Sequence, residues 1–442
     1  MRSAPVPVLI VAACCAAAPT AQAAVSTPTR VSPSGQRVQD QAVGAGGGRT
    51  AVLMSAYTSR AGQWKYGVYA RIGTPRRIGP LQRLAGRQGR TPSIAVGADG
   101  TAVAAWVESR IGPRVSIAPP GRPFGPVRQL TATTASAPSP RPTVTLAGVA
   151  VTSAGRAVVT WRAGSSVEAA TADAGRRFRS TAVLGTSRTY MPTITVGLAG
   201  TAVVGWIDTP EPPQPNSPGP GRGALVQATT LLPSQTAFQT PTTLATLGYW
   251  GSSWGALGTG PSGAVVTWTQ ATELRVSRAG LTGEFSAPSS MLPSTRNSFG
   301  VATENDGATT VLWRTLEYAG AESDTVSRGA VYASTLPLNA GPTPAQTLSG
   351  AGWVPGNPQV AALASRTLAA WGETRTNRTS RLRVAIHRPG QPWQTLPTVR
   401  TENIELFTVR AAGSAHHGAI TWVQNTSGDE RSGPLYLATY RP

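Results

Sequence analysis

The chain has 442 residues and a formal net charge of +20, because 39 Lys and Arg residues stand against 19 Asp and Glu residues. A chain of this length can bury a core without covalent staples, and its two cysteines, Cys14 and Cys15, both lie near the N-terminus. Beyond residue 15 the sequence therefore excludes a disulfide, a thiol nucleophile and a cysteine-ligated metal site.

The positive charge favours acidic partners, such as nucleic acid or an anionic envelope polymer. The arginines are scattered along the chain rather than gathered in a stripe, and no nucleic-acid-binding motif accompanies them. Abundant Arg and Ala are also what a GC-rich genome produces. We therefore expect no nucleic-acid partner, whereas an anionic envelope polymer stays open.

Residues 1–23 have the pattern of a secretory signal peptide. Arg2 supplies the positive start, residues 6–18 are apolar, and Ala21-Gln22-Ala23 is a small-x-small cleavage site. Such a segment is too short to span a membrane. We expect cleavage after Ala23, secretion, and a single domain over residues 24–442. Lipid anchoring at Cys14 is the alternative, since residues 11–14 (VAAC) resemble a lipoprotein box.

Eight related segments follow one another along the chain, and seven of them end in tryptophan. The segments are residues 48–57, 92–106, 142–161, 192–206, 254–268, 299–313, 358–371 and 406–422. The weak first copy lacks the tryptophan, and the other seven tryptophans recur at intervals of 45–62 residues. This period is typical of the blades of a β-propeller and is too short for a string of independent sandwich domains.

Each unit reads as four strands. In residues 192–206 (PTITVGLAGTAVVGW), a Pro-led strand over 193–196 and a glycine turn precede a strand over 201–206. That second strand is apolar at nearly every position, which predicts burial of both faces between stacked blades. Third strands with alternating polarity are expected over 114–118, 166–171, 273–277 and 381–386, and fourth strands end at apolar residues such as Leu84, Leu184 and Leu244.

The fold class is therefore all-β: a single β-propeller of eight four-stranded blades, or seven if the first copy is not a full blade. The eighth unit ends after its third strand, and residues 28–33 near the mature N-terminus belong to no unit. We expect these residues to supply the missing strand, with Arg30 and Val31 beside residues 435–439, and so to close the ring.

One turn between a third and a fourth strand carries a motif. Thr171, Asp173, Gly175 and Phe178 fit Ser/Thr-x-Asp-x-Gly-x-x-aromatic. This motif resembles the Asp box of the bacterial neuraminidase repeat, which occurs at this turn in sialidase-type propellers. The resemblance implies a structural role, in which the Asp ties the turn and the aromatic residue packs between strands. Three equivalent turns, residues 120–124, 277–285 and 387–393, hold degenerate copies without the Asp.

The resemblance does not extend to a catalytic set. Sialidases of this family use three arginines, a Tyr–Glu pair and an acidic proton donor, and carry an arginine-isoleucine-proline signature. The nearest string here, Arg71-Ile72-Gly73, lacks the proline. Glu317 and Tyr318 are adjacent, so on a strand their side chains would point to opposite faces. We assign no catalytic residue. Whether the protein is an enzyme stays open, and the missing catalytic set favours a protein that is not an enzyme.

Polar residues recur two positions after the repeat tryptophan, where second strands end: Glu108, Asp208, Gln270, Glu373 and Gln424. A ring of them would line one mouth of the propeller, where carboxylates suit glycoside hydrolysis or cation binding. Strand ends are also polar simply because they meet water. Trp250 and Trp353 fall between units on the same face, and aromatic side chains beside carboxylates suit sugar binding. We expect Glu108, Asp208, Glu373, Trp250 and Trp353 to bind the ligand.

The function that these patterns favour is binding. We expect a secreted, monomeric propeller, without a membrane span, cofactor or metal, that recognises a glycan, an envelope polymer or an extracellular protein through the face with the longest loops. The alternative is a sialidase-like exo-glycoside hydrolase. His416-His417 is a weak metal candidate, because neighbouring side chains on an extended chain point apart.

Overall fold

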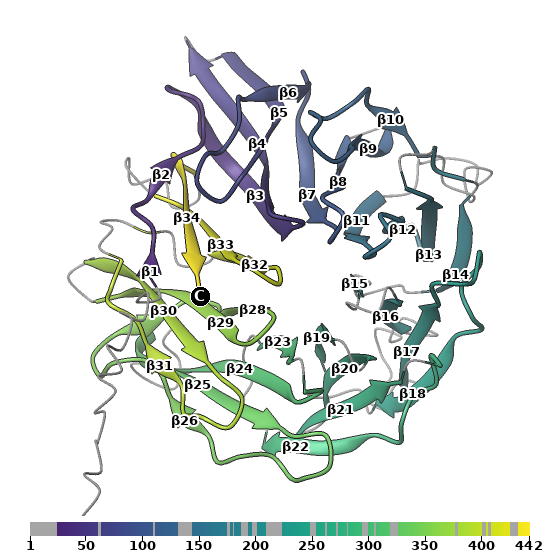
Figure 1. Ribbon diagram of the computed structural model, residues 1–442, viewed down its shortest axis with the longest axis vertical. Coiled ribbons are helices and arrows are strands. Elements are labelled where there is room, and N and C mark those ends of the chain that lie inside the picture. Colours follow the sequence, from purple (N-terminus) through teal and green to yellow (C-terminus); the bar gives the residue numbers. More distant parts are fainter. Residues whose placement is uncertain are drawn as a thin grey trace, which may run out of the picture.

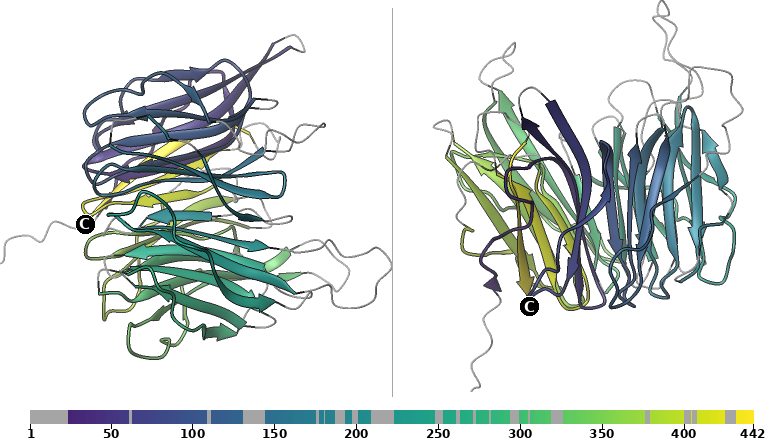
Figure 2. Two further views of the ribbon diagram at one scale, coloured as in Figure 1. Left: turned by 90° about the vertical axis from the view of Figure 1, so that its right-hand side faces the viewer. Right: turned by 90° about the horizontal axis from the view of Figure 1, so that it is seen from above.

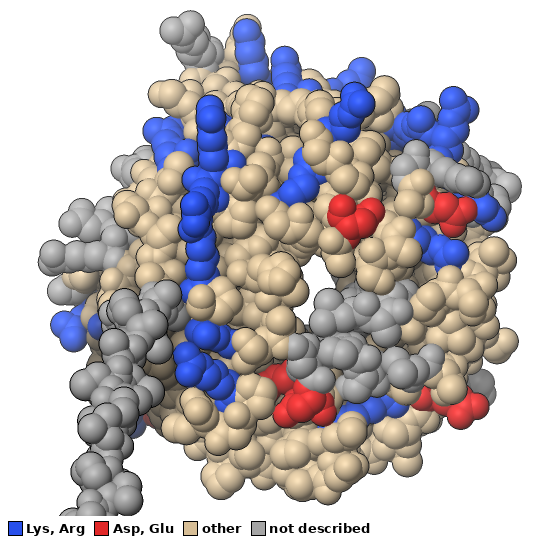
Figure 3. Space-filling view, in the orientation of Figure 1, with Lys and Arg blue, Asp and Glu red and all other residues tan. Residues whose placement is uncertain are grey.

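The structure is a computed structural model that describes residues 24–60, 63–108, 111–130, 144–174, 177–179, 181–186, 193–196, 201–208, 223–247, 253–260, 263–270, 273–280, 282–293, 299–304, 306–318, 326–375, 379–399, 404, 408–424 and 432–442. These residues form 34 strands and no helix. The strands make eight sheets arranged in a ring around a central opening (Figures 1 and 3). The protein is an eight-bladed β-propeller.

The blades follow the chain. Blades 1 to 4 are β3 (Arg37–Gly46), β4 (Arg49–Arg60), β5 (Gln63–Gly73) and β6 (Gln82–Ala85); β7 (Gly89–Val96), β8 (Ala102–Glu108), β9 (Gly112–Ala118) and β10 (Arg128–Gln129); β11 (Val144–Val151), β12 (Ala157–Ala163), β13 (Ser166–Ala172) and β14 (Ala182–Thr186); and β15 (Thr193–Val196), β16 (Ala202–Asp208), β17 (Ala224–Leu231) and β18 (Thr242–Leu247).

Blades 5 to 7 are β19 (Ser253–Gly260), β20 (Gly263–Gln270), β21 (Glu273–Ala279) and β22 (Ser289–Pro293); β23 (Phe299–Thr303), β24 (Thr309–Tyr318), β25 (Val326–Leu336) and β26 (Gln346–Thr347); and β27 (Val354–Pro355) with β28 (Gln359–Ala362), β29 (Thr367–Thr374), β30 (Ser380–His387) and β31 (Gln394–Thr395). Blade 8 is β32 (Arg410–Gly413), β33 (Gly418–Val423) and β34 (Leu435–Arg441), completed by β1 (Ala24–Val25) and β2 (Thr29–Arg30).

Each blade is an antiparallel meander whose first strand lies nearest the centre of the ring (Figure 1). Connections from first to second and from third to fourth strands, such as residues 152–156 and 232–241, therefore lie on one side of the ring, which we call the turn face. Connections from second to third and from fourth to first strands, such as residues 164–165 and 348–353, lie on the other, the loop face. Figures 1 and 3 look onto the turn face, and Figure 2 shows the ring from two sides. Among the described residues there is no helix long and apolar enough to span a membrane.

The repeat tryptophans fill the spaces between blades. Each of them packs against the blade that precedes it in the chain: Trp106, Trp161, Trp206, Trp268, Trp313, Trp371 and Trp422. All seven are buried, as the continuous apolarity of the second strands predicts. Because each cluster joins two neighbouring blades, the core of the protein is a set of interblade layers rather than one central mass.

Side-chain amides also fasten blades to one another. Gln82 of blade 1 donates to the carbonyl of Phe124 in blade 2 at 2.6 Å and accepts from its N–H at 3.0 Å. Gln346 of blade 6 makes the same pair of bonds to Trp393 of blade 7, at 3.0 and 2.9 Å. A glutamine amide that meets a backbone amide in this way satisfies polar groups that a strand would otherwise satisfy.

The ring closes through the N-terminal strand, as the sequence predicts. Thr29 pairs with Leu437 and Arg30 with Tyr436, and the N–H of Val31 donates to the carbonyl of Leu435 at 2.8 Å. Val31 is fully buried in the cluster between blades 8 and 1. The chain termini thus form one sheet, which leaves β34 without a free edge.

The interface between blades 8 and 1 differs from the other seven, because Met54 rather than a tryptophan fills it. Polar pairs cross it: Tyr57 Oη lies 2.8 Å from Ser432 Oγ, and Thr421 donates to Gln41 at 2.6 Å. Asp40 and Arg410 also face each other here. Burial raises the pKa of Asp40, an effect that the charge of Arg410 counteracts. Closure therefore combines apolar packing with hydrogen bonds.

We predict that a protein starting at residue 34 is less stable than one starting at residue 24. Removing the N-terminal strands exposes the edge of β34 and the apolar surface that Val31 covers, and an exposed edge pairs with other chains. Burial of one valine contributes about 1.5–3 kcal/mol, so the melting temperature should drop and size-exclusion chromatography should show aggregates. A truncated protein that stays monodisperse and melts with the longer one would show that closure does not depend on this strand.

We also predict that His417 makes stability depend on pH. Its ring nitrogens lie 3.0 Å from Thr50 Oγ1 and 2.9 Å from Ser414 Oγ. Burial, with smaller effects of His416 and Arg441, lowers the pKa of His417 below its ordinary 6.5. Between the two pKa values the unfolded chain binds more protons than the folded one, so the free energy of unfolding falls as the pH decreases below 6.5.

Thermal melts at about pH 7.5 and about pH 5.5 check this prediction, because the pH change spans that window. The melting temperature of His417→Asn should fall less on acidification than that of the unmodified protein. His416→Asn is the matched control, since the His416 side chain is exposed. Equal responses of all three proteins would contradict the prediction.

Candidate functional site

Two of the three carboxylates expected at the mouth of the ring lie inside the blades. Because residues two apart on a strand share a face, each carboxylate sits beside its repeat tryptophan. Trp106 Nε1 donates to Glu108 at 3.2 Å, and Trp371 Nε1 donates to Glu373 at 2.7 Å. Glu108 is 5% exposed and Glu373 is fully buried. These carboxylates satisfy buried indole N–H groups.

The same two carboxylates also pair with arginines of the adjacent third strand. Arg114 Nε lies 3.5 Å from Glu108 Oε2, and Arg381 Nε donates to Glu373 Oε2 at 2.8 Å. The sequence carries a signal for this arrangement that was not among our expectations. The signal is a Trp-x-Glu motif on the second strand together with an Arg on the adjacent third strand.

The other polar residues expected at strand ends are more exposed than Glu108 and Glu373. Asp208 is partly exposed and accepts a hydrogen bond from Thr186 Oγ1 at 2.8 Å. Gln270 and Gln424 are partly exposed as well. Trp250 lies outside the described residues. Glu108, Asp208 and Glu373 belong to blades 2, 4 and 7, so no two of them lie in one blade.

Trp353 lies on the loop face, at the start of blade 7, but its ring is covered. The guanidinium carbons of Arg375 and Arg381 lie over the ring, 4.4 and 3.8 Å from its centroid. Trp353 is consequently only 6% exposed. Arg381 is neutralised by Glu373, whereas the exposed side chain of Arg375 makes no hydrogen bond or ion pair to any described residue. The aromatic ring of Trp353 thus holds a positive charge that no acidic group among the described residues pairs with.

The Asp-box turn joins β13 to β14 on the turn face. Asp173 Oδ2 accepts from Arg179 at 2.7 Å, Asp173 Oδ1 lies 3.4 Å from Arg156 Nε, and the carbonyl of Thr171 accepts from the N–H of Arg179 at 2.8 Å. Phe178 packs against the cluster between blades 2 and 3. Gly175 lies outside the described residues. These contacts tie the turn to its blade.

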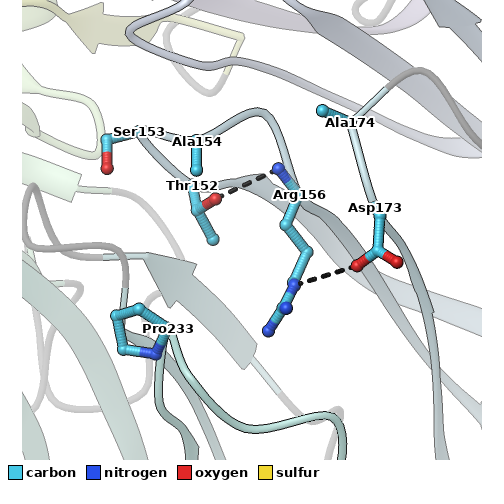
Figure 4. Close-up of a pocket in the computed structure, with 7 residues that line it drawn as sticks. All are labelled: Thr152, Ser153, Ala154, Arg156, Asp173, Ala174 and Pro233. Atoms are coloured by element: carbon cyan, nitrogen blue, oxygen red, sulfur yellow. Dashed lines mark hydrogen bonds and ion pairs between the residues drawn. The ribbon is translucent and has the colours of Figure 1, made fainter.

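Beside this turn the surface is hollowed between blades 3 and 4, and the hollow measures about 510 Å³. Thr152, Ser153, Ala154, Arg156, Asp173 and Ala174 of blade 3 and Pro233 of blade 4 line it (Figure 4).

A buried polar network that the sequence did not reveal joins blades 6 and 7. Glu304 accepts hydrogen bonds from Thr310 at 2.6 Å and Thr367 at 3.1 Å, and His387 Nδ1 lies 2.7 Å away. The ring of His387 stacks on Trp393 with centroids 5.2 Å apart. The network is enclosed, so it supports the interface rather than a ligand. His417 is likewise engaged with hydroxyls, and the described residues contain no group of three or more His, Cys, Asp or Glu that could hold a metal ion.

Comparison with known proteins identifies the fold. No protein-family model matches the chain. No curated protein is similar to it in sequence. Among solved structures, the polysaccharide lyase Uly1 is similar with a TM-score of 0.51 at 9% identity, over 91% of this chain and 90% of that one. The BP39L lectin from Burkholderia pseudomallei has a TM-score of 0.49 at 10% identity, over 82% and 99%.

The NanB sialidase from Streptococcus pneumoniae gives a TM-score of 0.41 at 9% identity, over 89% of this chain and 83% of that one. The likeness to Uly1 is one of fold alone at 9% identity, and none of the three similarities assigns a role to a residue. The resemblance of residues 171–178 to an Asp box stays a prediction from the sequence.

We predict that Glu373→Ala destabilises the protein much more than Asp208→Ala does. Removing Glu373 strands the indole N–H of Trp371 and the charge of Arg381, and breaking a buried pair from one side costs about 3 kcal/mol or more. Asp208 loses one partly exposed hydrogen bond, worth about 1 kcal/mol. Denaturant unfolding measures both changes, and equal losses would contradict the assignment of Glu373 to the blade interior.

Proposed function

We propose that the protein is a secreted propeller that binds an acidic glycan through its loop face. The observation that carries this proposal is Arg375, whose exposed guanidinium has no partner among the described residues and rests on Trp353. A carboxylate is the natural partner of a guanidinium, because the two groups form parallel charge-assisted hydrogen bonds.

The geometry around Arg375 favours binding. Stacking on Trp353 restricts the long side chain before a ligand arrives, so less conformational entropy is lost on association. The second arginine, Arg381, is 22% exposed and keeps Glu373 neutralised. The overall charge of +20 adds long-range attraction for a polyanion.

The identity of the ligand as a glycan rests on two supports. A rigid ring with connections of variable length on one face is a scaffold on which loops carry recognition. The lyase whose ring is similar acts on a polysaccharide by its name. Secretion through the signal peptide at residues 1–23 would place the protein where envelope and extracellular glycans are found. The runner-up functions are protein recognition by the same face and a sialidase-like hydrolase.

We predict that Arg375→Gln weakens the binding of an acidic polysaccharide, such as a polyuronate, about tenfold. The reason is that hydrogen bonds to charged groups contribute about 1.5–3 kcal/mol. Arg388→Gln is the matched control, since it removes one exposed arginine from the turn face of the same blade. Calorimetric titration at low and high salt measures both, and affinity should fall with salt.

Unchanged affinity of Arg375→Gln, or an equal loss in Arg388→Gln, would overturn the loop-face assignment. Equal binding of a neutral polysaccharide would overturn the acidic ligand. A fluorogenic sialoside assay tests the hydrolase: turnover that survives purification would replace binding by catalysis as the main function.

A further inference from the structure

The hollow between blades 3 and 4 lies on the turn face, on the opposite side of the ring from Arg375. It is built by three connections: residues 152–156 between β11 and β12, Asp173 and Ala174 after β13, and Pro233 after β17. Its volume of about 510 Å³ falls within the range of small-molecule sites. Figure 4 shows Arg156 extending across it, with Asp173 on one side and Pro233 on the other.

Arg156 differs from two other arginines that join neighbouring blades on the turn face. Arg49 makes three hydrogen bonds to carbonyls of blade 2, at 2.7–2.9 Å. Arg278 makes three to carbonyls of blade 6, at 2.9–3.1 Å. Arg156 makes one such bond, from Nη1 to the carbonyl of Gln235 at 2.6 Å, and an ion pair from Nε to Asp173. Its Nη2 has no hydrogen-bond partner among the described residues.

Arg156 and Asp173 are the two charged residues that line the hollow, and Arg179 approaches Asp173 from outside the lining. Asp173 is shared between Arg156 and Arg179, so two guanidinium groups face one carboxylate. Both arginines and Asp173 retain contact with solvent, with side chains 21%, 56% and 34% exposed. The neighbouring Ser153 adds a hydroxyl, and Ala154 and Pro233 add apolar surface. The hollow therefore offers donors for an anion, acceptors for hydroxyl groups, and a surface for C–H groups.

We propose that this hollow binds a single sugar acid of the hexuronate type. The sugar carboxylate accepts hydrogen bonds from the unused N–H groups of Arg156, since a guanidinium matches a carboxylate in geometry and charge. Sugar hydroxyls donate to Asp173, whose oxygens each have a second lone pair. The apolar face of the sugar ring lies against Ala154 or Pro233. The site is independent of the loop-face site, so one ring would hold acidic sugars on both faces and could bridge two glycan chains.

Glucuronic acid and glucose are the probes, tested by ligand-observed NMR and calorimetry on the protein of residues 24–442. We expect glucuronic acid to bind with a Kd on the order of 1 mM, the range of weak small-ligand binding, and glucose to bind at least about tenfold more weakly. Absence of glucuronic acid binding overturns the proposal, and equal binding of glucose overturns its acidic ligand.

Two variants test the location. Arg156→Gln should weaken glucuronic acid binding about tenfold or more, because it removes the charged donors. Ala154→Phe should do the same by filling the hollow while it leaves the hydrogen bond of Arg156 to Gln235 in place. Circular dichroism and thermal melts establish that both proteins are folded. Retained affinity in both variants overturns the site.

Arg278→Gln is the matched control. It removes an arginine that donates three hydrogen bonds to backbone carbonyls of the next blade. The substitution should therefore lower the melting temperature and leave glucuronic acid binding unchanged. Arg375→Gln separates the two faces: it should weaken polyuronate binding and leave the binding of the single sugar intact. Loss of the single sugar in Arg375→Gln, with retention in Arg156→Gln, overturns the hollow and leaves the loop-face proposal standing.

Discussion

The burial of one tryptophan against the preceding blade is the interaction on which the ring depends. A four-stranded sheet with apolar side chains on both faces has no stable existence alone, because each face must be removed from water. Trp206 on one strand fills the space that blade 3 leaves, and Trp268 does the same for blade 4. Seven interfaces are built in this way. The stability of the propeller is therefore distributed over neighbouring pairs, each of which needs the next.

The interface between blades 8 and 1, where the ring closes, contains no repeat tryptophan. The first blade has no repeat tryptophan, so blades 8 and 1 meet through Met54, Val31 and a set of hydrogen bonds that includes His417 with Thr50. A smaller side chain leaves room for these polar contacts, and through His417 we expect this interface to depend on pH. Pairing of β2 with β34 compensates, because it ties the two ends of the chain into one sheet and removes an edge.

Side chains on the turn face connect neighbouring blades. On the turn face, Arg49 and Gln346 donate hydrogen bonds to backbone carbonyls of the next blade, and Arg49 makes three of them. Arg156 on the turn face and Arg375 on the loop face are both held in place, by Gln235 and by Trp353, with N–H groups that have no partner among the described residues. A guanidinium group that is held in place while some of its N–H groups lack a partner can bind a ligand through those groups. The proposals for the loop face and for the hollow rest on such groups.

The sequence by itself determined the architecture. Period, glycine turns and the doubly apolar second strands predicted eight blades, and the strand missing from the last unit predicted which residues close the ring. These features are local or repeated, so the chain carries them within each unit. The sites were decided by tertiary structure. Glu373 and Trp353 were expected to meet a ligand, yet Glu373 is buried beside Trp371 and Trp353 lies under two arginines. With 39 Lys and Arg residues, composition could not tell Arg156 or Arg375 from the others. Only the tertiary structure decides which guanidinium groups meet carbonyls of the next blade, as Arg49 does, and which keep N–H groups without a partner among the described residues, as Arg156 does.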